Sequence, residues 1–600
     1  MKNQDTSLFN HFQRSLCEGP IALASFGLVG CTLWTKHCRL RTARLHTIAL
    51  LATALICCVA GGPVAAQTAS PPVLLIHSGN TVAPDGSIYV FDSIMTPVIN
   101  ASGQIAFYAT LAGQSSPVGI VAGAPGALQI VARQGDAAPS GGNFSSFSYP
   151  IINSAGTVAF FANTSVNGPG IFARTPGFPA TTAALVGTPT PATGNYATLN
   201  NPVLNASGQV AFLARTSFDD FAIFAGTPGT TLTTAALGGN PSPAGFTYNQ
   251  LTGPAINSAG KVVFRASLSS GSGLFYGTPG TTLTTVALGS STTPAGGVFG
   301  IFSSTPTVNA AGQVAFISDR NGNSSSAIFA GAPGTTLTPV AIQGDTAPAG
   351  GNYNNFANLE LNAAGQVAFL ANLTGGSSSR GVFVGTPGQP LQTIALNGST
   401  APSSGGATYN FISDLALNAS GQVAFIGNLT GAGVNFTNDT GLYAGSPGNV
   451  VKIVREGDTV DIDPTAGVNN QVVSGISFYT STGFITVGSG GEDGRAVSFN
   501  DSGVLVYRLS FGSSSGIFMS SIAPVSTPGD FNGDGAVDGS DFLLWQRGGS
   551  PLPLSSADLN EWKTAMGATA AAANVIPEPA TLVLLMFAAF GSCLRRCRAA

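Results

Sequence analysis

One short acidic segment near the C-terminal end spaces its oxygen-bearing side chains in a pattern that suits a metal ion. With Asp530 as position 1, such side chains occupy positions 1, 3, 5, 9 and 12, and a glycine stands at position 6. Ca²⁺ binds several hard oxygen ligands from a sharply turned loop, including a main-chain carbonyl at position 7. The sequence therefore predicts one Ca²⁺ site, with an acidic solvated linker as the alternative. The expected ligands are Asp530, Asn532, Asp534, Ala536, Asp538 and Asp541.

The residues after this loop favour helices. Residues 542–547 are predicted to form a helix that leaves the loop, and residues 557–563 are a second helix-like stretch. Residues 530–567 resemble the first half of a type I dockerin, in which a calcium loop that ends in Asp leads into a short helix. The resemblance implies a cohesin-like partner and an association with polysaccharide. The second half lacks another Asp-x-Asn-x-Asp-Gly loop, so only one Ca²⁺ site is expected.

The N-terminal 66 residues are predicted to be a leader that ends in a signal peptide. Three arginines precede an apolar run over residues 47–60, and Val64-Ala65-Ala66 forms a small-residue cleavage site. Cleavage is therefore expected between Ala66 and Gln67. The run is short for a transmembrane anchor, which is one alternative. A lipidated Cys31, in the stretch Leu28-Val-Gly-Cys31, is the other.

The C-terminal residues carry a second targeting pattern. Pro577-Glu578-Pro579 is followed by an apolar stretch over residues 580–594 and then by three arginines. This order resembles the PEP-CTERM sorting signal. The resemblance implies a membrane helix that holds the exported chain transiently in the inner membrane, and an exosortase-type sorting protease that processes it. We therefore expect an exported protein at the cell surface or in the extracellular matrix.

Few side chains of the exported part could carry out acid–base or nucleophilic chemistry. No cysteine lies between Gln67 and Ser592, and His77 is the only histidine left after signal removal. These counts exclude a thiol nucleophile and a zinc site built on two imidazoles. Residues 67–523 contain only the glutamates Glu360, Glu456 and Glu492. We therefore expect no enzyme activity.

The aspartates fall into two groups. Asp136, Asp345 and Asp458 recur in Gly-Asp turns whose equivalents elsewhere carry Asn or Thr, which favours a structural role. The pairs Asp219-Asp220 and Asp319-Arg320 follow strands and are expected in exposed loop tips. Such tips are candidates for ligand recognition, with a purely solvated loop as the alternative.

A motif repeated along the chain must position the acidic residues of the segment 67–523. The pattern Asn-x-x-Gly-x-(Val/Ile)-x-Phe recurs at intervals of 52 to 56 residues, and a degenerate eighth copy follows after a longer interval. The copies begin at Asn100, Asn153, Asn205, Asn257, Asn309, Asn362, Asn418 and Asn500. They are similar to the Asn-x-x-Gly-x-x-Ala-Phe tandem-repeat proteins of bacteria, which implies a surface location and no particular activity. Repeats of this length indicate one structural unit per copy.

Each repeat predicts four short strands. Asn-x-x-Gly is turn chemistry, and the Val-x-Phe strand after it is apolar on both faces, which indicates burial on both sides. A strand such as residues 223–226 ends at a Thr-Pro-Gly turn, and two further short strands lead to the next Asn. We therefore predict an all-β chain with an eight-bladed β-propeller. Seven blades with an irregular segment, or a β-solenoid, are the alternatives.

Composition limits the partners and completes the domain plan. Only 8% of the residues are charged and the net charge is −4, so no basic face for nucleic acid is expected. The predicted order is a leader (1–66), the propeller (67–523), a linker (524–529), the dockerin-like segment (530–567), an Ala-rich linker (568–574) and the sorting signal (575–600). The expected function is a non-catalytic surface protein for binding or structure. A polysaccharide-associated protein, either glycan-active or docked to a cohesin-like partner, is the alternative.

Overall fold

The computed structural model describes residues 67–79, 81–89, 95–112, 117–303, 305–320, 325–463, 468–479, 497–522, 529, 537–547 and 555–566. The chain divides into two compact units. One is Ala66–Val525, and the other combines Met1–Ala65 with Ser526–Ala600. The predicted leader, the ligands Asp530, Asn532, Asp534 and Ala536, and the sorting motif Pro577-Glu578-Pro579 lie outside the described residues.

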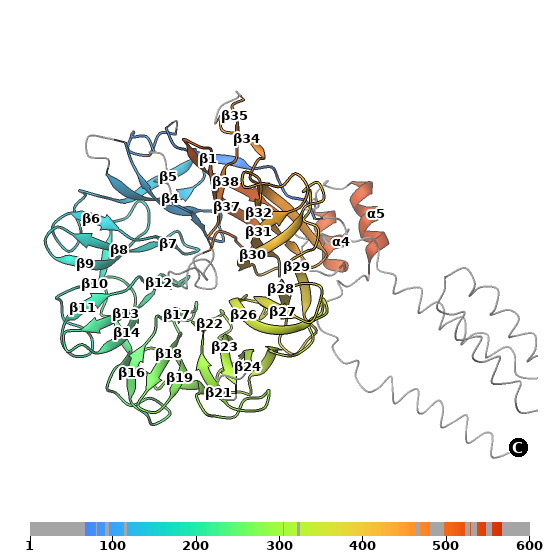
Figure 1. Ribbon diagram of the computed structural model, residues 1–600. Coiled ribbons are helices and arrows are strands. Elements are labelled where there is room, and N and C mark those ends of the chain that lie inside the picture. Colours follow the sequence, from blue (N-terminus) through green and yellow to red (C-terminus); the bar gives the residue numbers. More distant parts are fainter. Residues whose placement is uncertain are drawn as a thin grey trace, which may run out of the picture. The chain divides into compact units, whose positions relative to one another are not determined.

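Eight sheets of four or five strands form the blades of a ring within the first unit (Figure 1). Where a sheet has five strands, two short pieces pair with the same neighbour, so every blade has four strand positions. We call these positions A to D, in chain order in every blade except the last, whose D strand is β1. The prediction of an all-β propeller with eight four-stranded blades is confirmed, and the seven-bladed alternative is wrong.

The first five blades follow the chain without interruption. Their strands are, for blade 1, β2 (Val98–Ile99), β3 (Ile105–Thr110), β4 (Val118–Ala124) and β5 (Ala127–Arg133); for blade 2, β6 (Phe144–Phe147), β7 (Ile151–Ile152), β8 (Val158–Thr164), β9 (Gly168–Arg174) and β10 (Thr181–Leu185); for blade 3, β11 (Tyr196–Leu199), β12 (Val203–Leu204), β13 (Val210–Thr216), β14 (Phe221–Gly226) and β15 (Thr233–Leu237); for blade 4, β16 (Tyr248–Leu251), β17 (Ala255–Ile256), β18 (Val262–Leu268), β19 (Ser272–Gly277) and β20 (Thr284–Leu288); and for blade 5, β21 (Phe299–Phe302), β22 (Thr307–Val308), β23 (Val314–Arg320), β24 (Ser325–Gly331) and β25 (Thr338–Ile342).

The last three blades include the closure of the ring. Their strands are, for blade 6, β26 (Asn352–Leu361), β27 (Val367–Thr374), β28 (Arg380–Gly385) and β29 (Gln392–Leu396); for blade 7, β30 (Thr408–Leu417), β31 (Val423–Thr430), β32 (Thr440–Ser446) and β33 (Asn449–Arg455); and for blade 8, β36 (Gly475–Ser477), β37 (Val504–Ser510), β38 (Ser515–Ser521) and β1 (Val73–His77). A hairpin of β34 (Thr459–Asp461) and β35 (Asn470–Val472) precedes blade 8.

Strands from both ends of the propeller segment complete blade 8. Strand β1 pairs antiparallel with β38, so residues next to the predicted cleavage site supply the D strand of the last blade. The long interval before Asn500 is accounted for in part by β34 and β35, which lie outside the eight blades. The degenerate eighth repeat is therefore a true blade.

The Asn-x-x-Gly turn joins strand A to strand B in each blade. In blade 3, Gly208 has a φ of 79° and its N–H donates to the Asn205 carbonyl at 3.0 Å. The Asn205 Oδ1 also accepts the N–H of Gln209 at 2.8 Å. The positive φ explains why Gly is used here, since a Cβ is disfavoured in that region.

Three aromatic rings fill the core of most blades, one from each of strands A, B and C. In blade 3, the Tyr196 ring meets Phe224 edge-on with centroids 5.1 Å apart, and Phe212 lies 6.0 Å from Phe224. All three rings are buried. Edge-to-face pairs of this kind add about 0.5–1.5 kcal/mol to the free energy gained by burial alone. The predicted burial of the Val-x-Phe strands is confirmed.

Strand A is longer than its short apolar run predicts. In blade 3 the structure adds β11 before β12, and in blades 6 and 7 strand A is one continuous strand, β26 or β30. The extra residues include a buried Tyr, Tyr196 in blade 3 and Tyr353 in blade 6, which two exposed residues follow, and bulges interrupt their register. The polar, Gly-rich composition of this stretch hid the strand, because pairing with strand B rather than local propensity holds it in place.

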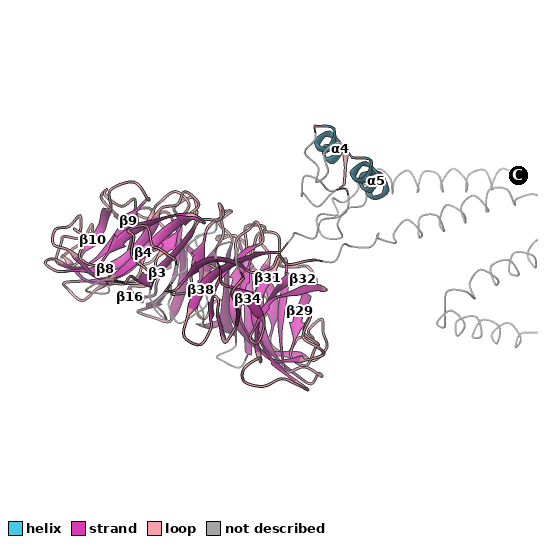
Figure 2. Cartoon of the chain, turned by 90° about the horizontal axis from the view of Figure 1, so that it is seen from above, coloured by secondary structure: helices cyan, strands magenta, loops and turns pink. Residues whose placement is uncertain are grey.

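The second unit contributes two described helices, which Figure 2 colours cyan. They are α4 (Gly539–Gln546) and α5 (Ser556–Ala565), and they lie where the sequence predicts helical stretches. Ser555 caps α5, since its hydroxyl accepts the Asp558 N–H at 3.0 Å. No helix among the described residues is both long and apolar enough to cross a membrane, and the predicted C-terminal membrane helix lies outside those residues.

Candidate functional site

Eight buried asparagines form a closed ring of hydrogen bonds at the centre of the propeller. Each is the first residue of a repeat, and its Nδ2 donates to the main-chain carbonyl of the corresponding Asn in the next blade. The Nδ2 of Asn500 donates to the carbonyl of Asn100 at 3.0 Å, which closes the ring. Figure 1 shows the short strands β7, β12, β17 and β22 nearest the centre. The repeat motif therefore holds neighbouring blades together as well as forming a turn.

A second contact between blades explains two other motif positions. The side chain of Gln209 lies against Gly260 of the next repeat, where a Cβ would sit 2.5 Å from the Gln209 Oε1. The same relation joins Gln313 to Gly365. The repeat motif predicts the Gly in its turn and the Gln in a strand. It does not predict this contact, because the two residues lie in different repeats.

The strand ends remote from these turns carry the variable part of each blade. We call the residues that lie side by side there the polar row. Its strand-B member is polar in all eight blades: Thr110, Asn163, Arg215, Ser267, Asp319, Asn372, Asn428 and Ser510. Positions that vary on a constant scaffold are the usual place for recognition.

The polar rows of blades 6 and 7 contain amide, guanidinium and aromatic side chains. Blade 6 aligns Asn355, Asn372 and Arg380 across strands A, B and C, and no other blade has a charged residue at the Arg380 position. Blade 7 aligns Phe411, Asn428 and Thr440 in the same way. Phe411 is 44% exposed.

Arg380 joins the two rows. Its Nε donates to the Ile412 carbonyl of blade 7 at 2.8 Å, and its Nη1 donates to the Asn372 Oδ1 at 3.2 Å. Its guanidinium carbon lies 4.5 Å from the centroid of the Phe411 ring, within cation–π range. Burial lowers the pKa of Arg380, and nearby Asp414 opposes that shift. The Asn397 Nδ2 donates to the Asn410 carbonyl beside them at 2.8 Å. We call this cluster, Asn372, Arg380, Asn397, Asn410, Phe411 and Asp414, the seam.

Backbone strain accompanies the seam. Asp414 has a φ of 46° in strand A of blade 7, and Asn358 has a φ of 47° at the matching place in blade 6. Both positions coincide with breaks in strand register. A left-handed conformation at a residue other than Gly costs about 1–3 kcal/mol. Asn and Asp tolerate it best, which explains their use at these two bulges.

Two carboxyl groups lie together beside the blade 7 row. Burial raises the pKa of Glu456, and its contact with Asp439 adds to that rise, while hydrogen bonds from Thr440 oppose it. The Thr440 N–H donates to the Glu456 Oε2 at 3.2 Å. In blade 5, Gln343 accepts the Ser326 N–H in the same way at 2.8 Å. An uncharged amide can therefore fill the same place, which favours a structural role for Glu456.

The loop candidates fare differently in the structure. Asp219 is exposed at the tip before β14 and forms an ion pair with Arg215, as expected for a surface loop. Asp319 and Arg320 are the last residues of β23, not a loop tip, and both are only half exposed. The prediction of an exposed tip was wrong there, because β23 extends further than its apolar run. Burial raises the pKa of Asp319.

The Gly-Asp turns and His77 have structural positions. The Asp136 Oδ2 accepts the Arg133 N–H at 3.1 Å, and the Asp458 Oδ2 accepts the Arg455 N–H at 2.8 Å, so these carboxylates close their turns. His77 is buried at the end of β1, and burial lowers the pKa of its imidazole.

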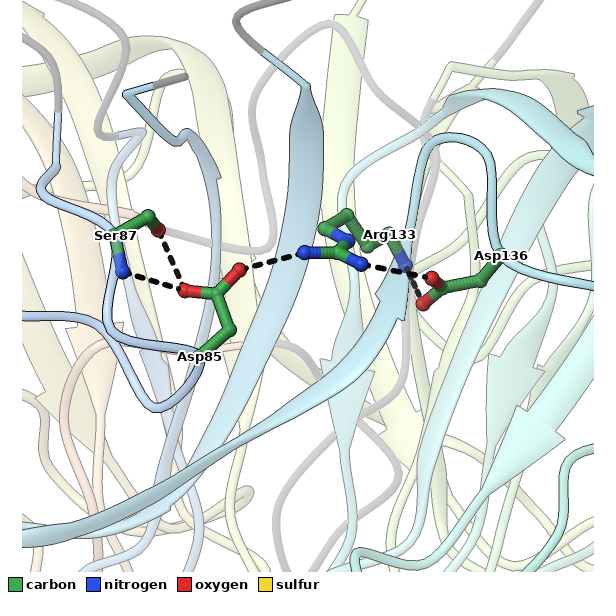
Figure 3. A network of polar contacts seen from close by, with 4 residues as sticks. All are labelled: Asp85, Ser87, Arg133 and Asp136. Atoms are coloured by element: carbon green, nitrogen blue, oxygen red, sulfur yellow. Dashed lines mark hydrogen bonds and ion pairs between the residues drawn. The ribbon is translucent and has the colours of Figure 1, made fainter. Parts of the chain in front are cut away.

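One further charged cluster supports the start of the ring. Figure 3 shows Arg133 between Asp85 and Asp136, with Ser87 beside Asp85. The Arg133 Nη1 lies 2.8 Å from the Asp85 Oδ2. Burial raises the pKa of Asp85, but hydrogen bonds from Ser87 and from Arg133 outweigh it and leave the pKa lowered. These residues fix the loop after β1 to strand β5.

A comparison with protein families identifies the family to which this chain belongs. A family of unknown function, DUF7453, matches residues 64–174 and 166–529, well over half of the chain. The chain belongs to the DUF7453 family. A comparison with curated proteins gives no match.

Solved structures that resemble this DUF7453 chain include propellers with low identity. The β-propeller domain of the Trilobed protease from Pyrococcus furiosus is 9% identical, with 61% of this chain and 99% of that chain covered and a TM-score of 0.35. An oligogalacturonate lyase in complex with manganese is 12% identical, with 76% and 98% covered and a TM-score of 0.35. The Dos1 propeller is 9% identical, with 75% and 95% covered and the same TM-score.

The predicted Ca²⁺ segment begins where the DUF7453 match ends. Two of its six expected ligands are described, Asp538 and Asp541. Asp541 is fully buried in the first turn of α4, and its Oδ2 accepts the Asp538 N–H at 2.9 Å. A buried carboxylate at the last loop position fits a hard cation. Among the described residues no three acidic, His or Cys side chains form a metal-binding group.

Proposed function

We propose that this DUF7453 protein is an exported, exosortase-sorted protein of the cell surface or extracellular matrix, whose propeller is a non-catalytic binding scaffold. The sorting motif Pro577-Glu578-Pro579 and the cleavage site after Ala66 support the location. The Arg380–Phe411 contact carries the binding part of the proposal, because it places an aromatic ring, a guanidinium and several amides together on one exposed surface.

The chemistry of the seam favours a polysaccharide as the ligand. The amides of Asn372 and of the exposed Asn410 offer donors and acceptors that match sugar hydroxyls. The half-exposed ring of Phe411 offers an apolar face of the kind that packs against the C–H groups of a sugar ring. The asparagine ring and the interlocked blades keep this surface rigid, which lowers the entropic cost of binding.

A binding measurement on the exported chain tests the seam. We expect Arg380→Ala and Phe411→Ala each to weaken binding of a soluble polysaccharide panel at least about tenfold, equivalent to about 1.4 kcal/mol. The controls are Arg215→Ala, which removes an arginine from the row of blade 3, and Phe218→Ala, which removes an exposed ring elsewhere. Affinity that is equal in all four variants, or no binding to any member of the panel, would contradict the assignment.

The two-helix unit supports a second candidate, an adaptor that docks to a cohesin-like partner. The Trp562 ring lies 4.8 Å from Phe542, and its Nε1 donates to the Asp538 carbonyl at 2.7 Å, so α5 packs against the end of the predicted loop. In the presence of Ca²⁺, Asp530, Asn532, Asp534, the Ala536 carbonyl, Asp538 and Asp541 would hold the ion, which would fix the loop for docking.

Calorimetry with Ca²⁺ tests this adaptor. We expect saturable binding of about one ion per chain that is lost in Asp541→Ala, since the closing carboxylate is removed. Glu561→Ala, an exposed acidic residue on α5, is the matched control and should bind normally. Unchanged binding in Asp541→Ala, or no binding by the unaltered chain, would reduce residues 530–567 to a spacer.

A further inference from the structure

The first residue of the mature chain occupies an unusual place in the ring. Gln67, which the proposed signal cleavage would expose, is only 6% exposed. Its Oε1 accepts the N–H of Ser446, the last residue of β32 in blade 7, at 3.1 Å. Gln67 itself precedes β1 of blade 8, so this bond links the chain start to the neighbouring blade.

The residues that follow fix Gln67 firmly. Ala69 forms a β-bridge with Ile522, and the Ser70 N–H donates to the Ser521 carbonyl at 2.8 Å. The Ser521 N–H in turn donates to the Ser70 Oγ at 2.8 Å. The new N-terminus would therefore be ordered from its first residues, with the side-chain amide held against a main-chain donor.

We propose that Gln67 is a modification site, at which the mature N-terminus cyclises to pyroglutamate on the folded propeller. This rests on the signal cleavage of the proposed function. In the reaction the α-amino nitrogen attacks the Gln67 Cδ, a C–N bond forms, and the bond from Cδ to Nε2 breaks. Ammonia leaves, and it carries away a proton from the attacking amine. No oxidant, reductant or cofactor is consumed.

The site favours this reaction in two ways. Negative charge develops on Oε1 as the amine attacks, and the Ser446 N–H already points at that oxygen, as a single oxyanion donor would. Gln67 as a residue is buried in the uncleaved chain, and an amine freed at such a position is favoured in its neutral, nucleophilic form. The product carries no charge at a buried position, and its lactam carbonyl remains an acceptor for the Ser446 N–H.

Cyclisation would protect the closure of the ring. The D strand of blade 8 begins only a few residues after Gln67, at Val73. An aminopeptidase requires a free α-amine, so a lactam at Gln67 blocks trimming toward that strand. The modification would therefore preserve the one blade that depends on both ends of the propeller segment.

Mass spectrometry of the chain, produced from its full gene in an exporting host, tests the inference. We expect a chain that begins at residue 67 with a mass lower by one ammonia and that resists N-terminal sequencing until pyroglutamyl aminopeptidase is added. A chain that begins at residue 67 and keeps its ammonia during incubation would overturn the modification and leave export intact. A different first residue would overturn the cleavage and the modification together.

A rate measurement separates the role of the fold from intrinsic reactivity. For freshly cleaved protein, we expect ammonia release from the folded chain to be at least about tenfold faster than from the same chain in urea, because only the fold supplies the Ser446 donor. Equal rates would overturn the assisted step. Gln67→Asn is the matched control, since it keeps a side-chain amide but cannot form the five-membered lactam, and it should retain a free α-amine.

Discussion

Replacing one ring asparagine, Asn309→Ala, is expected to lower the free energy of unfolding by about 3 kcal/mol, because buried polar groups left without partners cost about 1–3 kcal/mol each. The Asn309 Nδ2 donates to the Asn362 carbonyl at 3.0 Å and to the Gln313 Oε1 at 2.8 Å. Its Oδ1 accepts the Gln313 N–H at 2.9 Å. All of these bonds are lost together. Urea denaturation of the exported chain measures the change.

Two further variants make this prediction specific. Asn354→Ala, at an exposed position in β26, is the control and should change stability by less than about 0.5 kcal/mol. Asn309→Asp keeps the bond from Gln313 N–H but turns a carboxylate oxygen toward the Asn362 carbonyl. Burial next to another oxygen raises the pKa of the introduced carboxyl group in the folded chain. The free energy of unfolding of this variant should therefore fall as pH rises above the ordinary Asp pKa of about 3.9. A stability of Asn309→Ala equal to that of the control would contradict the ring.

Deleting residues 67–77 is expected to open the propeller, with the largest effect of all the changes considered. Strand β1 pairs with β38 from Val73↔Met519 to His77↔Gly516, so the deletion leaves this edge of β38 unpaired. It also removes the fully buried Ile76, which alone is worth about 2–5 kcal/mol. The measurement is the thermal midpoint of the truncated chain, which should fall steeply and be accompanied by aggregation through the free edge.

Restoring the missing strand as a separate peptide provides the control. A synthetic peptide of residues 67–79 should raise the midpoint of the truncated chain in a saturable way, since it binds only the folded ring. The same peptide with Ile76→Asp should have no effect, because it would bury an unpaired charge. A truncated chain as stable as the full one, or no response to either peptide, would show that β1 does not close the ring.

Local patterns were sufficient to predict much of the fold. The spacing of Asn205 and Gly208 marks a turn, and the Val-Ala-Phe run after it marks a strand buried on both sides, both of which the structure confirms. These features depend on backbone sterics and on alternation within a few residues, so neighbouring residues alone encode them. The number of blades could be predicted because the repeat has eight copies, and each copy is too small to bury its own apolar faces without its neighbours.

The candidate site could not be predicted in this way. Arg380 and Phe411 lie in different repeats, and neither belongs to a motif, so only the packing of blade 6 on blade 7 brings them together. The same holds for Asp319, which the sequence placed in a loop and the structure places in β23. Pairing with a neighbouring strand decided where that strand ends, and pairing energy is not a property of the local sequence.

The sequence by itself determined the repeat, its turn, its buried strand, and hence an all-β ring of eight units, because each depends on chemistry within a few residues. The sequence also contains the predicted signal peptide, sorting motif and Ca²⁺ ligands as linear patterns. The tertiary structure alone decided that each Asn bonds to the next repeat, that β1 completes blade 8, and that Gln67 meets Ser446. Contacts at the closure of the ring join residues far apart in the chain, such as Ser70 and Ser521, which are 451 positions apart. Closure of the ring is the physical reason that they meet.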